Sequence, residues 1–228
     1  MAEAARFLDV PTSTFASWAR GYRKPRARGA DIVGEPIVTS FRATNSGPAP
    51  VVPFVGLAEG LVLAAIRHQG VPLQRIRPAL AVLARELGID HALASRALYT
   101  DGAEVLYDYA EAGGDTPEAR SARDLVVVRN KQRVFTEVVD DYLHRIEYGP
   151  DSYAARLRLP GYERATVLVD PARSFGRPIL RHGGARVADV LQRFWADPDE
   201  DLDSLSAEFG VPVTELLDLL RVASRRAA

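Results

Sequence analysis

Two stretches near opposite ends of the chain share one pattern, and together they decide the expected fold. The first reads Ala4-Ala5-Arg6-Phe7-Leu8-Asp9-Val10-Pro11-Thr12-Ser13-Thr14-Phe15. The second reads Leu205-Ser206-Ala207-Glu208-Phe209-Gly210-Val211-Pro212-Val213-Thr214-Glu215-Leu216. In both, a turn residue precedes Val-Pro, and an apolar residue follows four positions after the proline. Because proline suits the first turn of a helix, where no N–H is needed, each stretch predicts two short helices joined by a tight turn, the helix-turn-helix pattern.

The two copies differ in charge. Residues 1–30 carry six basic and two acidic side chains, a net charge of +4, whereas residues 197–218 carry eight acidic side chains and no basic one. The whole chain of 228 residues has a net charge of −1. Since phosphate attracts positive and repels negative surfaces, we expect the first copy to bind DNA and the second to contact protein. The alternative for the first copy is a purely structural helix pair.

Spacing in the first copy separates a buried side from an exposed one. Phe15 and Trp18 are placed to face the core. Hydroxyls and a guanidinium remain on the other side, where such groups can reach base edges and phosphates, and a basic turn follows. The candidate DNA-binding residues are Thr12, Ser13, Ser17, Arg20, Tyr22, Arg23 and Lys24.

The rest of the chain predicts a mainly α fold with a small β component: two winged-helix or helix-turn-helix-like units joined by a mixed α+β middle region. The expected domains are 1–43 with a basic wing, a proline-rich linker 44–53, a helical and α+β region 54–163, and a contact domain 164–228.

Within these domains, an apolar stripe from Leu73 to Leu87 predicts a helix, and Pro78 inside it predicts a kink or break near Arg77. The stripe suits a core or a dimer seam. A hairpin over 125–135 and a helix from about Thr136 to Gly149 are expected next. A strand at 166–169 and helices near 185–196, 201–209 and 212–226 complete the prediction.

Composition excludes several function classes. The chain has no cysteine, so disulfides, thiolate metal sites and cysteine nucleophiles are absent. No apolar run is long enough to span a bilayer and no secretory signal is recognisable, which predicts a cytoplasmic protein without membrane contact. The four histidines lack zinc-site spacing, and neither a G-x-S-x-G elbow nor a Walker loop occurs. We therefore expect no enzyme, no metal and no cofactor.

The Gly pair within 181–186 is interpreted as a tight turn that begins a helix, with anion binding as the alternative.

Two family resemblances extend this interpretation. The residues Asp170-Pro171, Phe175-Gly176-Arg177-Pro178-Ile179, Val187, Val190-Leu191 and Phe209-Gly210-Val211-Pro212 resemble domain-of-unknown-function family 433. The amino-terminal residues Ala5, Leu8, Val10-Pro11, Phe15 and Trp18, with 70–77, resemble the MerR-type winged helix. The combination resembles VapB-like antitoxins of type II toxin–antitoxin pairs, although the sensor cysteines of many MerR regulators are missing.

The resemblance implies a homodimeric antitoxin that neutralises a PIN-type ribonuclease toxin and represses its own operon by binding operator DNA. Arginine pairs carboxylates in a bidentate manner and could block such a toxin's acidic active site. The candidate toxin-contact residues are Arg173, Arg177, Arg221, Arg225 and Arg226. The alternative role for the tail arginines is to complement the carbonyl end of the last helix. The last helix is apolar over more than one face, so Leu216, Leu219, Leu220 and Val222 are candidate dimer-interface residues.

Two other functions stay open at this point. One is a MerR-like regulator that senses a small molecule through residues 54–163 and has no toxin partner. The other is an interaction scaffold that does not bind DNA.

Overall fold

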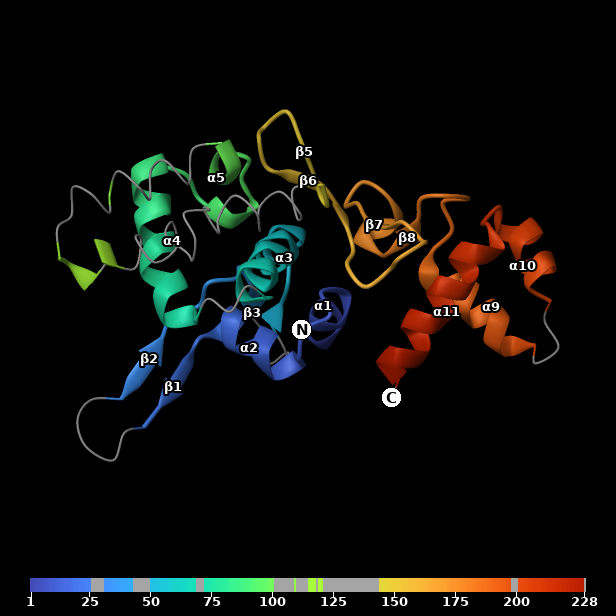
Figure 1. The fold of residues 1–228 in the computed structure, drawn as a ribbon, viewed down its shortest axis with the longest axis horizontal. Coiled ribbons are helices and arrows are strands. Elements are labelled where there is room, and N and C mark those ends of the chain that lie inside the picture. The colour runs from blue at the N-terminus through green and yellow to red at the C-terminus, as the bar shows by residue number, and fades with distance from the viewer. Residues whose placement is uncertain are drawn as a thin grey trace, which may run out of the picture. The chain divides into compact units, whose positions relative to one another are not determined.

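The computed structural model describes residues 1–25, 31–42, 50–68, 72–100, 109, 115–117, 119–120, 144–197 and 201–227. Short strands accompany a larger set of helices, which confirms the expected mainly α fold class (Figure 1). The chain forms two compact units. The amino-terminal unit comprises Met1–Ala5 and Val10–Ala154, and the carboxy-terminal unit comprises Arg6–Asp9 and Ala155–Ala228. The finer division into four domains stays a prediction.

The first helix-turn-helix forms as its sequence predicts. Helix α1 spans Ala2–Phe7 and helix α2 spans Thr12–Arg20. Asp9 takes a left-handed φ of 57°, a conformation that Asp tolerates better than most residues. The N–H of Val10 then donates to the Ala5 carbonyl at 3.0 Å, and Pro11 enters α2 with φ −58°. The turn residue and the proline therefore have the roles that the pattern assigned to them.

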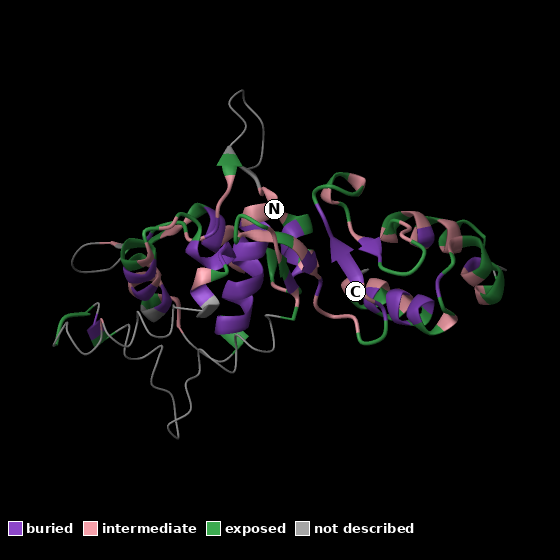
Figure 2. Ribbon diagram, turned by 90° about the horizontal axis from the view of Figure 1, so that it is seen from above, coloured by how far each residue is buried: buried purple, intermediate pink, exposed green. Residues whose placement is uncertain are grey.

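Two helices carry most of the described core of the amino-terminal unit. Every residue of α3 (Phe54–His68) from Gly56 to Ile66 is buried, as the helix in Figure 2 shows. Helix α4 (Leu73–Leu87) buries one side through Ile76, Ala79, Val82 and Leu83. It continues through Pro78, so a break near Arg77 is wrong, whereas a kink there stays a prediction. Proline removes one backbone hydrogen bond, and burial of the apolar stripe on either side of Pro78 offsets that loss.

Short strands follow α2 in the same unit. Strand β1 (Tyr22–Lys24) pairs antiparallel with β2 (Ile32–Gly34), and β3 (Phe41–Arg42) pairs with β4 (Pro50–Val51). Strand β4 lies inside the segment expected as a linker. After α4 come the 3₁₀ helix η1 (Ala92–Ala94), α5 (Ala97–Thr100) and β5 (Ile146–Tyr148).

One helix prediction needs correction in this region. The helix expected from Thr136 does not reach Gly149, because His144 lies in a turn and Ile146 begins a strand. The start of that helix and the hairpin expected over 125–135 lie outside the described residues.

The carboxy-terminal unit combines an antiparallel ladder with three helices. Strand β7 (Val167–Val169) pairs with β6 (Ala154–Arg158) and with β8 (Ile179–Leu180), in registers that set Leu157 opposite Val169 and Val167 opposite Leu180. The 3₁₀ turn η2 (Ser174–Gly176) precedes β8. Helices α9 (Val187–Ala196), α10 (Leu202–Phe209) and α11 (Val213–Ala227) follow. The predicted strand and all three helices are confirmed.

The second helix-turn-helix also forms. Gly210 takes a left-handed φ of 64° between α10 and α11, as the turn position of the pattern requires. Asp201 begins α10 by accepting a hydrogen bond from the Ser204 N–H at 3.2 Å. Asp201, one of the eight acidic residues of 197–218, thus caps the start of α10.

Candidate functional site

Helix α2 presents a polar side that the rest of the amino-terminal unit leaves open. Phe15 and Trp18 are buried in the core with ring centroids 6.0 Å apart. Thr12, Ser13 and Arg20 are exposed. This division of buried and exposed residues agrees with the spacing in the sequence. The exposed hydroxyls lie in the first turn of α2, where backbone N–H groups lack partners within the helix and favour phosphate.

Ser17 differs from the other candidate hydroxyls on this helix. Its side chain is partly buried, and its Oγ donates a hydrogen bond of 2.8 Å to the Thr14 carbonyl. Because the Ser17 hydroxyl proton is used in this hydrogen bond, its oxygen can only accept a hydrogen bond from a ligand.

The end of α2 is fixed by the segment after the β1–β2 hairpin. The N–H groups of Ile37 and Val38 donate to the Trp18 carbonyl at 2.8 and 3.1 Å, and the Ser40 hydroxyl donates to the Ala19 carbonyl at 2.9 Å. Carbonyls in the last turn of a helix have no partner within the helix, so these bonds satisfy them. The orientation of α2 in its unit is thereby set from its carboxyl end.

The β1–β2 hairpin carries the remaining amino-terminal candidates. The Arg23 side chain is 76% exposed, and its Nε donates to Asp31 Oδ2 at 2.8 Å. Tyr22 is only partly exposed, and the Arg77 guanidinium stacks 5.3 Å from its ring centroid. Burial lowers the pKa of Arg77. Tyr22 thus attaches the hairpin to α4, while Arg23 is presented outward. Lys24 lies on β1 next to Arg23.

A buried carboxylate that the sequence interpretation missed supports this arrangement. Glu59 of α3 accepts a hydrogen bond of 2.6 Å from the Thr39 N–H, and its second oxygen lies 2.9 Å from His91 Nδ1. His91 is exposed and at the same time pairs with the buried Glu59. A charged residue within a fully apolar helix segment was the available signal, because such a residue is kept only where it is paired.

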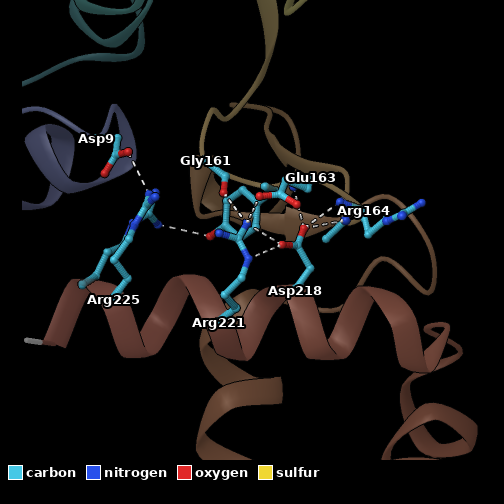
Figure 3. A network of polar contacts seen from close by, with 10 residues as sticks. Asp9, Gly161, Glu163, Arg164, Asp218, Arg221 and Arg225 are labelled. Atoms are coloured by element: carbon cyan, nitrogen blue, oxygen red, sulfur yellow. Dashed lines mark hydrogen bonds and ion pairs between the residues drawn. The ribbon is translucent and has the colours of Figure 1, made fainter.

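Asp218 and Arg221 of α11 hold the 161–165 loop of the carboxy-terminal unit (Figure 3). Asp218 Oδ2 accepts hydrogen bonds from the N–H groups of Glu163, Arg164 and Ala165 at 2.7, 2.8 and 3.0 Å. Arg221 donates to Asp218 Oδ1 at 2.7 Å and to the Gly161 carbonyl at 3.0 Å. The sequence singled out Arg221 for a partner protein, and the structure gives it an internal role.

The other two tail arginines are Arg225 and Arg226, and Arg226 also contacts the 161–165 loop. Arg226 donates to the Tyr162 hydroxyl at 3.2 Å and stacks 5.4 Å from the centre of that ring. Arg225 lies in the last turn of α11, and although its side chain is 48% exposed, its Nη2 donates to Asp9 Oδ2 at 2.8 Å. Two of the three tail arginines thus hold the 161–165 loop, a role that neither the toxin-contact hypothesis nor its alternative foresaw.

Arg173 and Arg177 flank the η2 turn after β7, and both are exposed. Asp170, at the end of β7, fixes the base of this loop. Its Oδ1 accepts from the Ala172 N–H at 2.9 Å, and its Oδ2 accepts from Arg156 Nη2 at 3.0 Å.

The candidate dimer residues lie in the core of their own unit. Leu216, Leu219 and Val222 are buried in the single chain, and Leu220 is partly buried. The expectation that their burial needs a second chain is therefore corrected. The ladder and helices of the carboxy-terminal unit supply enough apolar surface to cover them. Leu217, on the same helix, is the large apolar residue that stays exposed.

Several acidic side chains of residues 197–218 have partners within their own unit. Besides Asp201 and Asp218, Glu215 is buried with its Oε1 2.6 Å from His182 Nδ1, and Glu208 pairs with Arg193 at 3.4 Å. Across the described residues, no cluster of three or more metal-ligating side chains is found, and no helix there is long and apolar enough to cross a membrane.

Comparison with known proteins places this arrangement among relatives. A family model described as "Putative DNA-binding HTH domain" matches residues 1–80, which include α2, the β1–β2 hairpin and α3. The chain is 43% identical over 221 residues to "Putative antitoxin VapB45" of Mycobacterium tuberculosis (strain ATCC 25618 / H37Rv), covering 96% of this chain and 91% of that protein. The X-ray crystal structure of Rv2018 from Mycobacterium tuberculosis aligns with a TM-score of 0.78 at 41% identity, over 96% of this chain and 95% of that one.

An identity of 43% across nearly the full length of both sequences exceeds what a shared fold alone would explain. The family match to residues 1–80 includes α2, which presents its exposed polar side. The chain therefore carries a helix-turn-helix DNA-binding domain and belongs to the family of the VapB45 antitoxin.

Proposed function

We propose that this protein is an antitoxin that neutralises a PIN-type ribonuclease by direct binding and represses its own operon. It acts in the cytoplasm as a homodimer, by binding rather than by catalysis. In this proposal, residues 1–43 form a MerR-like reading head in which the β1–β2 hairpin is the wing. Residues 164–228 form the family-433-like module that holds the toxin, and a two-fold operator matches the two heads of a dimer.

The observation that carries the DNA-binding part is the open polar side of α2 beside an outward-facing Arg23. Thr12, Ser13 and Arg20 are exposed while Phe15 and Trp18 are buried, so the polar side has no packing role. Hydroxyl and guanidinium groups bond both base edges and phosphates. The net charge of +4 on residues 1–30 favours a polyanion.

The exposed arginines of the carboxy-terminal unit are the proposed contacts to the ribonuclease. Arg173 and Arg177 are exposed, and Arg225 is exposed although it also pairs with Asp9. A guanidinium pairs the carboxylates of a metal-dependent ribonuclease site in bidentate geometry. Arg221 and Arg226 contribute to this surface by holding the 161–165 loop.

A mobility-shift titration with DNA from upstream of the chain's own operon tests the proposal. The Arg20→Ala/Arg23→Ala variant should bind at least about tenfold more weakly, since each contact to DNA contributes of the order of 1 kcal/mol. Asp31→Ala is the matched control, because it breaks the same cross-strand ion pair and keeps the Arg23 charge. Arg186→Ala removes an exposed arginine of the other unit.

Asp31→Ala should bind at least as tightly as the wild type, because it removes a negative charge and releases Arg23, and Arg186→Ala should bind like the wild type. Equal binding by the double variant and the wild type would reject this surface as the DNA-binding site. Loss of binding in Asp31→Ala would mean that the hairpin's shape, and not the Arg23 charge, determines binding.

A further inference from the structure

The loop between β7 and β8 is rigidly held at its base. Asp170 is buried, and its carboxylate accepts hydrogen bonds from the Ala172 N–H and from Arg156 of β6. The Arg173 N–H donates to the Asp170 carbonyl at 3.0 Å, and the Arg177 N–H donates to the Ser174 carbonyl at 3.0 Å. The residues between these bonds are therefore presented in one defined conformation.

At the tip of this loop, the backbone is strained and a large apolar side chain faces solvent. Ser174 and Phe175 both have left-handed φ values, 48° and 54°, and Gly176 follows with 71°. The left-handed region is unfavourable for any residue with a Cβ. Phe175 is fully exposed, at 101% of its reference area, so it contributes nothing to the core. Strain combined with complete exposure of an aromatic ring works against stability and is typical of a functional surface.

Two basic residues flank Phe175 in the sequence. Arg173 and Arg177 lie on either side of it in sequence and are exposed. Among the described residues, neither guanidinium has a hydrogen-bond or ion-pair partner. Two cations beside an apolar anchor complement an apolar pocket whose rim carries carboxylates.

We propose that Phe175 is the anchor of the toxin-binding surface, inserting into an apolar pocket of the ribonuclease while Arg173 and Arg177 pair with carboxylates at its rim. This inference rests on the proposed function and identifies the side chain that carries most of the contact. Buried aromatic and arginine side chains dominate the energetics of protein interfaces. A loop already fixed by Asp170 loses little conformational freedom on binding, which favours affinity.

Two substitutions separate the binding role from any structural one. Phe175→Asn and Phe175→Gly remove the ring and place residues that tolerate left-handed backbone. Affinity of the full chain for the ribonuclease encoded beside its gene, co-expressed and then measured by calorimetry, should fall about 30-fold or more, the loss expected for an interface anchor. The Tm should stay unchanged or rise, and operator binding should be retained.

Leu217→Asn is the matched control, since it removes an exposed apolar side chain of the same unit from α11. It should bind the ribonuclease like the wild type. Undiminished binding by both Phe175 variants, with the wild type binding, would overturn the inference and leave the proposed function standing. Loss of self-association in place of ribonuclease binding would also overturn it, because the occupant would then be a second copy. Failure of the wild type to bind the ribonuclease would overturn the proposed toxin contact and the inference together.

Discussion

The carboxylate of Asp218 accepts a hydrogen bond of 3.0 Å from the N–H of Ala165, a residue with no exposed surface and 53 positions distant in the chain. Two further N–H groups of the same loop share this oxygen. One side chain of α11 therefore satisfies three consecutive backbone donors that no strand or helix pairs. The loop depends on this carboxylate for its conformation.

Replacing Asp218 with Ala should destabilise the carboxy-terminal unit by about 1–3 kcal/mol, because it leaves the buried Ala165 N–H unpaired. Asp218→Asn keeps one acceptor oxygen and should lose less. Glu163→Gln, in the same loop with a 74% exposed side chain, should change the free energy of unfolding by less than about 1 kcal/mol. Urea unfolding followed by circular dichroism measures all three. Equal stability of Asp218→Ala and Glu163→Gln would show that the three hydrogen bonds contribute little.

The same residue gives the unit an acid-sensitive contribution to stability. Burial alone would raise the pKa of Asp218, but the backbone N–H donors and the Arg221 guanidinium outweigh it, so the pKa lies below its ordinary value of 3.8. A carboxyl whose pKa is lowered by folding stabilises the protein above its unfolded pKa. That contribution is lost as the pH falls through the lowered value.

The free energy of unfolding, measured by denaturant titration between pH 7 and pH 2, should therefore fall more steeply on the acid side in the wild type than in Asp218→Asn. Parallel pH profiles for the two proteins would contradict the assignment.

Glu59 should control the local stability of the segment that fixes α2. Glu59→Ala leaves the Thr39 N–H without its acceptor, so hydrogen exchange at that amide should accelerate by about 10- to 100-fold, corresponding to about 1–3 kcal/mol. Glu86→Ala, on the exposed side of α4, is the control and should leave exchange at Thr39 unchanged. Unaltered exchange in Glu59→Ala would show that another group protects this amide.

The turn within 181–186 should tolerate no side chain at Gly183. A Cβ there would clash with the Phe209 carbonyl oxygen, and the φ of 67° is itself unfavourable for alanine. Gly183→Ala should therefore cost about 1–2 kcal/mol for the backbone and a further 1–3 kcal/mol for overpacking. Gly88→Ala has a similar φ of 63° and meets no atom within 4 Å, so only the first cost applies. A Tm no lower for Gly183→Ala than for Gly88→Ala would contradict the packing argument.

Local signals in the sequence predicted the helices well. The Val-Pro pairs, the turn residues Asp9 and Gly210, and the spacing of Phe15 and Trp18 all depend on neighbours within a few positions. Propensity and periodicity report such short-range relationships directly. The family resemblance added the antitoxin hypothesis, which is consistent with the relatives found.

Partners far apart in the chain escaped prediction. Arg221 and Gly161 are 60 positions apart, and nothing in the tail sequence indicates that its arginines hold that loop. The burial of Leu216 and Leu219 likewise depends on packing within the whole unit. Phe175 is exposed in a turn with left-handed backbone at Ser174 and Phe175, which residues of these types rarely adopt, so no local signal predicted such a surface.

The central claim is that α2 and the β1–β2 hairpin bind DNA through Arg20 and Arg23. The dependence of the observed binding constant on salt concentration, measured by titrating operator DNA with wild-type and Arg20→Ala/Arg23→Ala protein, tests it most directly. Each phosphate contact contributes about 0.9 to the slope of log K against log salt, so losing two contacts should make the slope shallower by about 2 per protomer. Superimposable salt dependences with equal affinity would contradict the account.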